Sequence, residues 1–154
     1  MSSLFADNLS SRTGTAITIS SGFRADNNMI ESGTVNAAKL SDSTDINLTN
    51  GMVHYFSTAE TTTSTPNFRS GVGINTMMSI GDVISVTLIS TSTNTAAYSA
   101  RVSIDDSLSG ITTVWNGGES PTEGTGSGND VYSYSIQKTG NATYRVYATV
   151  TNFG

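Results

Sequence analysis

The 154-residue chain contains no cysteine, a single histidine and only two prolines, and charged residues make up 12% of it. The absence of cysteine excludes disulfides, thiolate zinc sites and a cysteine nucleophile. Intrinsically disordered chains usually combine low hydrophobicity with high charge or abundant proline, and this chain has neither. Its length is sufficient for one domain with a hydrophobic core.

Positive charge is scarce as well, because seven Lys and Arg stand against twelve Asp and Glu and the net charge is −5. The basic residues occur singly along the chain, whereas binding to phosphate groups needs clustered Lys and Arg. No stretch approaches the ~20 apolar residues of a transmembrane helix. The opening residues, MSSLFADNLSSR, lack the basic segment and the apolar run of a signal peptide. We therefore expect no nucleic-acid partner and no membrane insertion.

Hydroxyl groups supply most of the polarity, since the chain has 24 Ser and 24 Thr beside 13 Asn. In its second half, apolar and polar residues alternate in residues 82–90, 97–104, 131–138 and 143–151. Successive side chains of a strand point to opposite faces, so each segment predicts a strand with one buried face. The residues predicted to face inward are Ile84, Val86, Leu88, Tyr98, Ala100, Val102, Ile104, Tyr132, Tyr134, Ile136, Tyr144, Val146, Ala148 and Val150.

Turn-forming residues separate these segments, and the Thr139-Gly140-Asn141 turn predicts a hairpin between the last two. No segment shows helical periodicity over ten or more residues. The pattern predicts an all-β protein, an antiparallel β-sandwich of the jelly-roll type with an N-terminal β-rich arm. We assign residues 1–50 to the arm, an attachment segment, and residues 51–154 to the sandwich domain. An arm that buries little surface alone is expected to dock on a neighbour, which predicts oligomerisation.

The histidine, His54, invites the hypothesis of a Ser-His-Asp hydrolase. The chain has no G-x-S-x-G nucleophile turn, and carboxylate pairs on recognisable motifs of a polysaccharide hydrolase are missing too. A triad without a motif can be recognised only by its geometry. We expect His54 to be an ordinary strand residue and the protein to have no enzymatic activity and no cofactor.

A Gly-rich loop, residues 117–130, carries the carboxylates Glu119, Glu123 and Asp130. Carboxylate oxygens are suitable ligands for Ca²⁺, but their spacing here matches no calcium-binding motif. This favours a solvated loop without a metal ion, and the sequence leaves the question of a bound ion open. Long loops within compact domains are often functional.

Aromatic residues raise the possibility of carbohydrate binding, in which rings stack on sugar faces. Most tyrosines fall on the predicted inner faces, where core packing is the expected role. Trp115 and Tyr147 are the aromatic residues predicted to be exposed. Together with Glu119 and Glu123, they form the predicted surface that could contact a ligand.

Two stretches resemble known virus proteins. LFADNLSSRTGTAITISSG, residues 4–22, resembles the recurrent opening of bacteriophage tail-fibre and appendage proteins. NGMVHYFSTAETTTSTPNFR, residues 50–69, with the later GDVISVTLIS, WNGGESPTEG and ATVTNFG, is similar to a domain of marine, especially cyanobacterial, phage virion proteins. The resemblance implies a non-enzymatic structural protein of the virion exterior, made in the host cytoplasm: a capsid decoration protein or a small tail or head appendage subunit.

The same resemblance implies partners. Such proteins are commonly homotrimers attached to other capsid or tail proteins through an N-terminal segment. The apolar residues expected to anchor that segment are Leu4, Phe5, Leu9, Ile17 and Ile19. The alternative function is that of a tail-fibre-type receptor or glycan-binding protein, in which residues 117–130 and Trp115 contact a host surface glycan.

Overall fold

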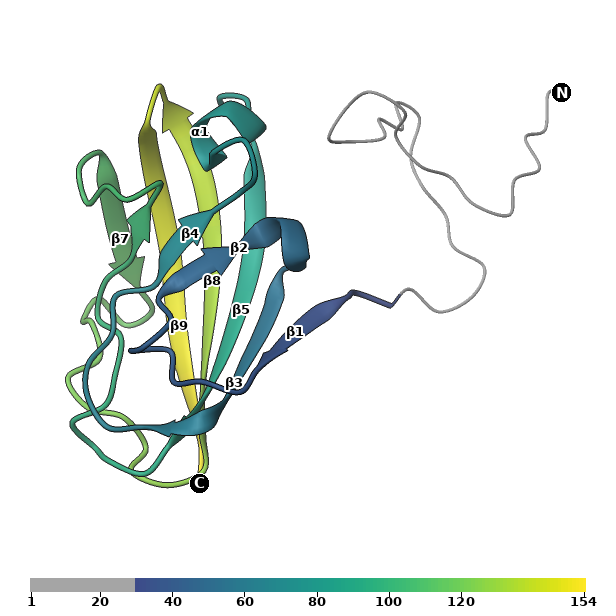
Figure 1. Ribbon diagram of the computed structural model, residues 1–154. Helices are drawn as coiled ribbons and strands as arrows, with labels where there is room; N and C mark the ends of the chain where they lie inside the picture. Colours follow the sequence, from purple (N-terminus) through teal and green to yellow (C-terminus); the bar gives the residue numbers. More distant parts are fainter. Residues whose placement is uncertain (1–29) are drawn as a thin grey trace, which may run out of the picture. The chain divides into compact units, whose positions relative to one another are not determined.

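The computed structural model describes residues 30–154, of which Glu31–Gly154 form one compact unit of two β-sheets. Figure 1 shows the long strands of the larger sheet side by side, with β2 and β4 in front of them. The predicted anchoring residues, from Leu4 to Ile19, lie outside the described residues. In the part of the chain that the structure describes, no helix is both long and apolar enough to cross a membrane.

The large sheet has six strands, and the small sheet has three. In spatial order the large sheet contains β1 (Gly33–Asn36), β3 (Val53–Glu60), β5 (Val83–Ser92), β8 (Asn129–Gly140), β9 (Thr143–Phe153) and β7 (Ile111–Trp115). The small sheet contains β2 (Asp45–Asn47), β4 (Asn67–Arg69) and β6 (Ser103–Ile104). Two single-turn helices, η1 (Leu48–Asn50) and α1 (Ile74–Met77), lie in the connections.

The chain winds between the two sheets, and this winding makes most strand pairs parallel. Strands β1, β3 and β5 belong to the large sheet, and β2, β4 and β6, which follow them one by one, belong to the small sheet. Because the chain crosses to the other sheet between visits, it returns to each sheet running in the same direction. Consequently β1–β3, β3–β5, β2–β4 and β4–β6 are parallel. Strand β8 is antiparallel to both β5 and β9, and because the β8–β9 hairpin reverses the chain once more, β9 is parallel to its other neighbour, β7.

The predicted antiparallel jelly-roll sandwich is therefore wrong. The protein is mostly β, as expected, but its large sheet is mixed and its small sheet is entirely parallel. The alternation of a strand indicates which side chains are buried, and it carries no information about the direction of the neighbouring strand. Residues 31–50 also belong to the compact unit, since β1 pairs with β3 and β2 pairs with β4.

Three of the four predicted strands are confirmed with their inner faces. In β8, Tyr132, Tyr134 and Ile136 are buried, and β5 and β9 show the same alternation. The predicted hairpin joins β8 to β9, with Gly140 opposite Thr143. These elements depend on local sequence: period-2 patterning and a short turn.

The fourth predicted strand, residues 97–104, is only partly correct. Its last two residues form β6, and Val102 and Ile104 are buried as expected. However, Ser99 and Ser103, predicted to face solvent, are buried, while Tyr98 and Ala100 are only half-buried. The Ser99 hydroxyl, which the pattern predicts to be in water, forms a hydrogen bond with the Ser64 hydroxyl. The backbone N–H of Ser99 donates to the Tyr132 hydroxyl at 3.1 Å, so tertiary contacts satisfy the polar groups of this buried residue.

The hydrophobic core lies between the two sheets. Phe68 of the small sheet packs edge-on against Tyr134 of the large sheet, with ring centroids 5.3 Å apart, and Trp115 packs edge-on against the same tyrosine at 6.3 Å. Such edge-to-face pairs are a favoured arrangement of aromatic rings. The small sheet and the core therefore cover one face of the large sheet, which we call the inner face, and the strands present their other side chains on the outer face.

Candidate functional site: a groove on the outer face of the large sheet

The outer face of the large sheet is almost free of charge. Its polar side chains are mainly those of Ser and Thr, from positions that alternate with the buried residues of each strand. Among the strand residues that the structure describes on this face, Arg145 is the single charged one. This is unusual for an exposed surface of an acidic chain, since Asp, Glu, Lys and Arg are found mostly at exposed positions.

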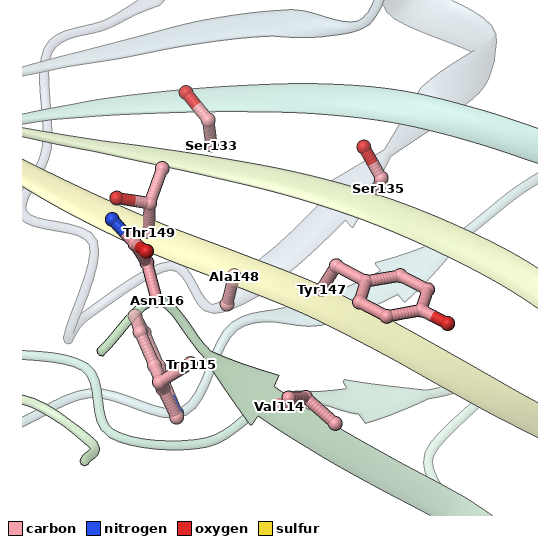
Figure 2. A pocket seen from close by; sticks show the side chains of 8 residues that line it. All are labelled: Val114, Trp115, Asn116, Ser133, Ser135, Tyr147, Ala148 and Thr149. Carbon is pink, nitrogen blue, oxygen red and sulfur yellow. The ribbon is translucent and has the colours of Figure 1, made fainter. Parts of the chain in front are cut away.

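A groove of about 420 Å³ crosses this face over β8, β9 and β7 (Figure 2). It is lined by Val114, Trp115, Asn116, Ser133, Ser135, Tyr147, Ala148 and Thr149. Figure 2 shows Tyr147 at one end of the groove and Asn116 and Thr149 at the other. The volume is within the range typical of small-molecule sites.

The register of the strands brings the lining residues together. Ser133 lies opposite Thr149 and Ser135 lies opposite Tyr147 in the β8–β9 pair, and Val114 of β7 lies opposite Tyr147 on the other side. Cross-strand neighbours on one face are about 4.5–5.5 Å apart at Cβ. Because the serine side chains are short, the surface is lower there than at the Tyr147 ring, and this difference in height forms the groove.

Tyr147 is the exposed aromatic residue of the groove, as the sequence predicts. Its side chain is 47% exposed, and the guanidinium carbon of Arg145 lies 6.0 Å from the centroid of its ring. A guanidinium at this distance is attracted by the ring's electrons. Arg145 therefore helps to hold the ring in place.

Trp115 is not exposed, and that part of the prediction is wrong. Only 8% of the residue is accessible, and its indole N–H donates to the carbonyl oxygen of Ala100 at 3.1 Å. The parallel register of β7 places Trp115 beside Ala148, on the inner face. A single alternating strand does not reveal which of its faces will be buried, so the sequence left the choice open. Trp115 lies at the back of the groove and is no platform for a ligand.

The other predicted contact residues do not join this groove. Glu119 and Glu123 are exposed in the loop that follows β7 and are not among the lining residues. Asp130 is buried, and its carboxylate accepts a hydrogen bond from the backbone N–H of Thr125 at 3.0 Å. Burial raises the pKa of Asp130. Among residues 30–154, no three His, Cys, Asp or Glu residues lie close enough together to hold a metal ion.

His54 lies in β3, as predicted, with its side chain on the inner face. Its Nε2 atom lies 3.0 Å from the carbonyl oxygen of Gly51, which can only accept, so this nitrogen carries the proton. Burial lowers the pKa of His54. In a hydrolytic triad the ring would bridge a nucleophile and a carboxylate, whereas the bond found here is to the backbone.

A second polar cluster lies on the small sheet. The Asn67 side chain donates to Asp45 and to Asp106 at 2.8 Å each, and Arg69 contacts the same two carboxylates at 2.9 and 3.3 Å. The hydrogen bond from Asn67, with a further contribution from Arg69, lowers the pKa of Asp45. These four side chains bind one another across β2, β4 and the turn after β6. They link the strands of the small sheet, and both carboxylates of the cluster are already bonded to Asn67 and Arg69.

Sequence reasoning missed most of the groove. It placed Ser133 and Ser135 on the solvent face of their strand correctly. It could not place them beside Asn116, because β7 joins the sheet through a parallel pair with β9 that no local pattern indicates. One sequence signal could have indicated the groove: Tyr147 is predicted to face outward, and so are the hydroxyl residues on the neighbouring strand of the predicted hairpin.

These features define a class: a mostly β protein of two layers with an uncharged outer face and an open groove on it. Comparison with known proteins gives no closer assignment, because no protein-family model, no curated protein and no solved structure matches the chain.

Proposed function

We propose that this chain is a non-enzymatic structural protein on the exterior of a phage particle, either a capsid decoration protein or a small head or tail appendage subunit, and that it assembles with copies of itself. The phage assignment rests on the sequence resemblance in residues 4–22 and 50–69. The observation that carries the self-assembly is an exposed apolar stripe on the outer face.

The apolar stripe consists of Val35, Tyr55, Ile89, Val131 and Phe153. The first four occupy one row across β1, β3, β5 and β8, since each lies opposite the next in the strand register. Phe153 of β9 flanks the row, and together with Tyr55, Ile89 and Val131 it lines a hollow of about 260 Å³. Val35 and Phe153 are 74% and 57% exposed, and Tyr55, Ile89 and Val131 are half-buried. A contiguous apolar patch that remains accessible to solvent marks a surface that binds a partner.

A second copy of the chain is the occupant that the charges favour. The net charge of −5 makes two copies repel each other in general. On the outer face this repulsion is weakest, because its described strand residues carry only Arg145. Contact through the stripe would bury apolar area and leave no carboxylate without water or a partner. The strand β1 at the end of the stripe also has one edge that pairs with no other described residue, and assembly is one way to cover such an edge.

Sedimentation equilibrium of the full chain tests the self-assembly. We expect an oligomer at about 50 µM, with the trimer as the predicted species, and the double variant Val35→Lys with Phe153→Lys should sediment as a monomer because it places charges in the interface. Both positions are exposed, so the substitutions should leave the fold intact. Val72→Lys is the matched control, since Val72 is 51% exposed and lies outside the large sheet. A monomeric wild-type chain would contradict the proposal, and a dimer would contradict the expected trimer.

Attachment to the particle is tested separately. The N-terminal segment is proposed to bind other virion proteins, so deletion of residues 1–22 should prevent incorporation into particles. Particles that contain as much of the truncated chain as of the intact chain would exclude this segment as the anchor. Cryo-electron microscopy of particles would distinguish a capsid location from a tail location.

A further inference from the structure

The groove over β8, β9 and β7 has the chemistry of a site for an uncharged, hydroxyl-rich ligand. None of its eight lining residues carries a charge. Ser133, Ser135, Thr149 and Asn116 offer hydroxyl and amide groups that both donate and accept hydrogen bonds. Tyr147 adds an exposed ring beside them. We infer that this groove binds a neutral saccharide, with the Tyr147 ring as the stacking surface.

A sugar ring fits this combination because it has two kinds of surface. One face of many pyranoses presents C–H groups, which pack on an aromatic ring, and the rim presents hydroxyls, which need partners that both donate and accept. The aromatic ring provides a large, rigid apolar contact at low cost in side-chain entropy. Ser133, Ser135 and Asn116 supply the polar partners within the same groove (Figure 2).

Other ligand classes fit less well. A peptide that adds a strand needs free backbone groups, but β8 and β9 lie inside the sheet and are paired on both sides. Strand β7 is an edge strand, and the edge that pairs with no other described strand is on the side away from β9 and the groove. An anionic ligand needs basic side chains in the groove, but none of the lining residues is basic, and Arg145 on the same face lies over the Tyr147 ring. A metal ion needs carboxylates or imidazoles, which the lining residues lack.

The sheet preorganises the groove. Its lining side chains come from strands β7, β8 and β9 and from Asn116, whose backbone N–H donates to Ala148 at 2.8 Å. Residues on paired strands are fixed more firmly than residues on loops, so little ordering is needed when a ligand binds. The inference goes beyond the proposed structural role and is independent of self-assembly, because the groove and the apolar stripe share no residue.

The full-length chain should be tested for retention on immobilised neutral gluco-, manno- and galacto-oligosaccharides, with sialylated and sulfated oligosaccharides as the charged arm. Trp115, the chain's only tryptophan, lies at the back of the groove, so a soluble ligand should change its fluorescence and give the dissociation constant. Tyr147→Ala and Ser135→Leu should each weaken binding about tenfold or more, the first by removing the ring and the second by filling the groove. Tyr147→Phe should retain most of the affinity.

Val83→Ala is the matched control, since Val83 is 55% exposed and lies on the same face of the large sheet, outside both the groove and the apolar stripe. It should leave saccharide binding unchanged. The inference is overturned if no neutral oligosaccharide binds, if only the charged ones do, or if Val83→Ala weakens binding as much as Tyr147→Ala. Circular dichroism checks that each variant is folded. If Tyr147→Ala does not fold, Ser135→Leu still provides the test of the groove.

Discussion

Tyr132 and Tyr134 are two residues apart in β8, and their hydroxyl groups have different surroundings. Both side chains are buried, and burial raises the pKa of both hydroxyls. The Tyr132 hydroxyl accepts a hydrogen bond from the backbone N–H of Ser99, whereas the Tyr134 hydroxyl has no partner among the described residues. A buried polar group without a partner is costly, and the removal of one partner of a buried pair is costly too.

This difference predicts opposite effects for the same substitution. Tyr132→Phe should lower the free energy of unfolding by about 1–3 kcal/mol, because it leaves the Ser99 N–H buried and unpaired. Tyr134→Phe should leave the free energy unchanged or raise it, by roughly 1 kcal/mol at most, because only an unpaired hydroxyl is removed. Urea denaturation of the two variants measures both effects. Equal losses in the two variants would contradict the assigned contacts.

His54 predicts a dependence of stability on pH. Burial lowers the pKa of His54 in the folded protein below the usual value of 6.5, so at low pH the unfolded chain binds this proton more readily than the folded chain. Its contribution to stability is complete above the unfolded pKa and is lost as the pH falls through the folded pKa. His54 should therefore make the wild-type protein less stable as the pH falls below about 6.5, the unfolded value, toward the lower folded pKa.

His54→Gln isolates this contribution, because glutamine keeps an N–H donor for the Gly51 carbonyl oxygen and does not titrate. The variant should show a smaller change of urea midpoint over the same pH interval. Asp130 titrates in both proteins, so the difference between them reports His54 alone. Parallel pH profiles for the two proteins would show that His54 is not held in its neutral form by the fold.

At the scale of elements, the Gly-rich loop of residues 117–130 is held in place by specific contacts. The backbone N–H of Gly124 donates to Thr95 at 2.8 Å, and the buried Asp130 accepts from Thr125. Gly124 also packs so closely that an added Cβ would collide with the carbonyl oxygen of Ala97. The loop is therefore packed firmly against the rest of the fold at Gly124 and Asp130.

Gly124→Ala should consequently destabilise the protein by about 1–3 kcal/mol, since overpacking forces the backbone to move. Gly71→Ala is the control, because a Cβ there would lie 3.7 Å from its nearest neighbour, the Thr49 hydroxyl, in ordinary contact. Thermal or urea unfolding compares the two. An unchanged Gly124→Ala protein would show that the loop can leave its position at no cost.

Strand β7 is the other element whose placement has an observable consequence. It lies at an edge of the large sheet, yet its Trp115 points inward and donates to the Ala100 carbonyl oxygen. We expect the fluorescence of Trp115 to be shielded from acrylamide in the native protein and to become accessible in urea. Quenching in the native state as strong as in urea would show that β7 does not pack as described.

At the scale of the whole molecule, one uncharged face is proposed to serve two purposes at different places. The apolar stripe crosses the sheet from β1 to β9, and the groove lies over β8, β9 and β7. Variants should separate the two: the double variant Val35→Lys with Phe153→Lys should be monomeric and still bind saccharide, and Tyr147→Ala should keep the oligomer and lose saccharide binding. Sedimentation measures the oligomeric state of each variant, and fluorescence titration measures its saccharide binding. Loss of both properties in either variant would contradict the proposed separation of the two sites.

Local sequence patterns were sufficient for part of this structure. The alternation in residues 82–90, 131–138 and 143–151 identified three strands and their buried faces, and the short turn at Gly140 identified the hairpin. These features depend on interactions between residues close in the chain, and a side-chain period of two is visible in any strand. The scarcity of charge on the outer face was also visible, as runs of Ser and Thr.

The direction and order of the strands required the folded chain. Whether β1, β3 and β5 run parallel depends on the chain crossing to the small sheet between them, and no pattern within a strand records that crossing. The inward turn of Trp115 and the meeting of Tyr147 with Ser135 follow from pairing between strands that are not local in sequence. The sequence specified which side chains alternate, and packing between the two sheets specified which of them meet.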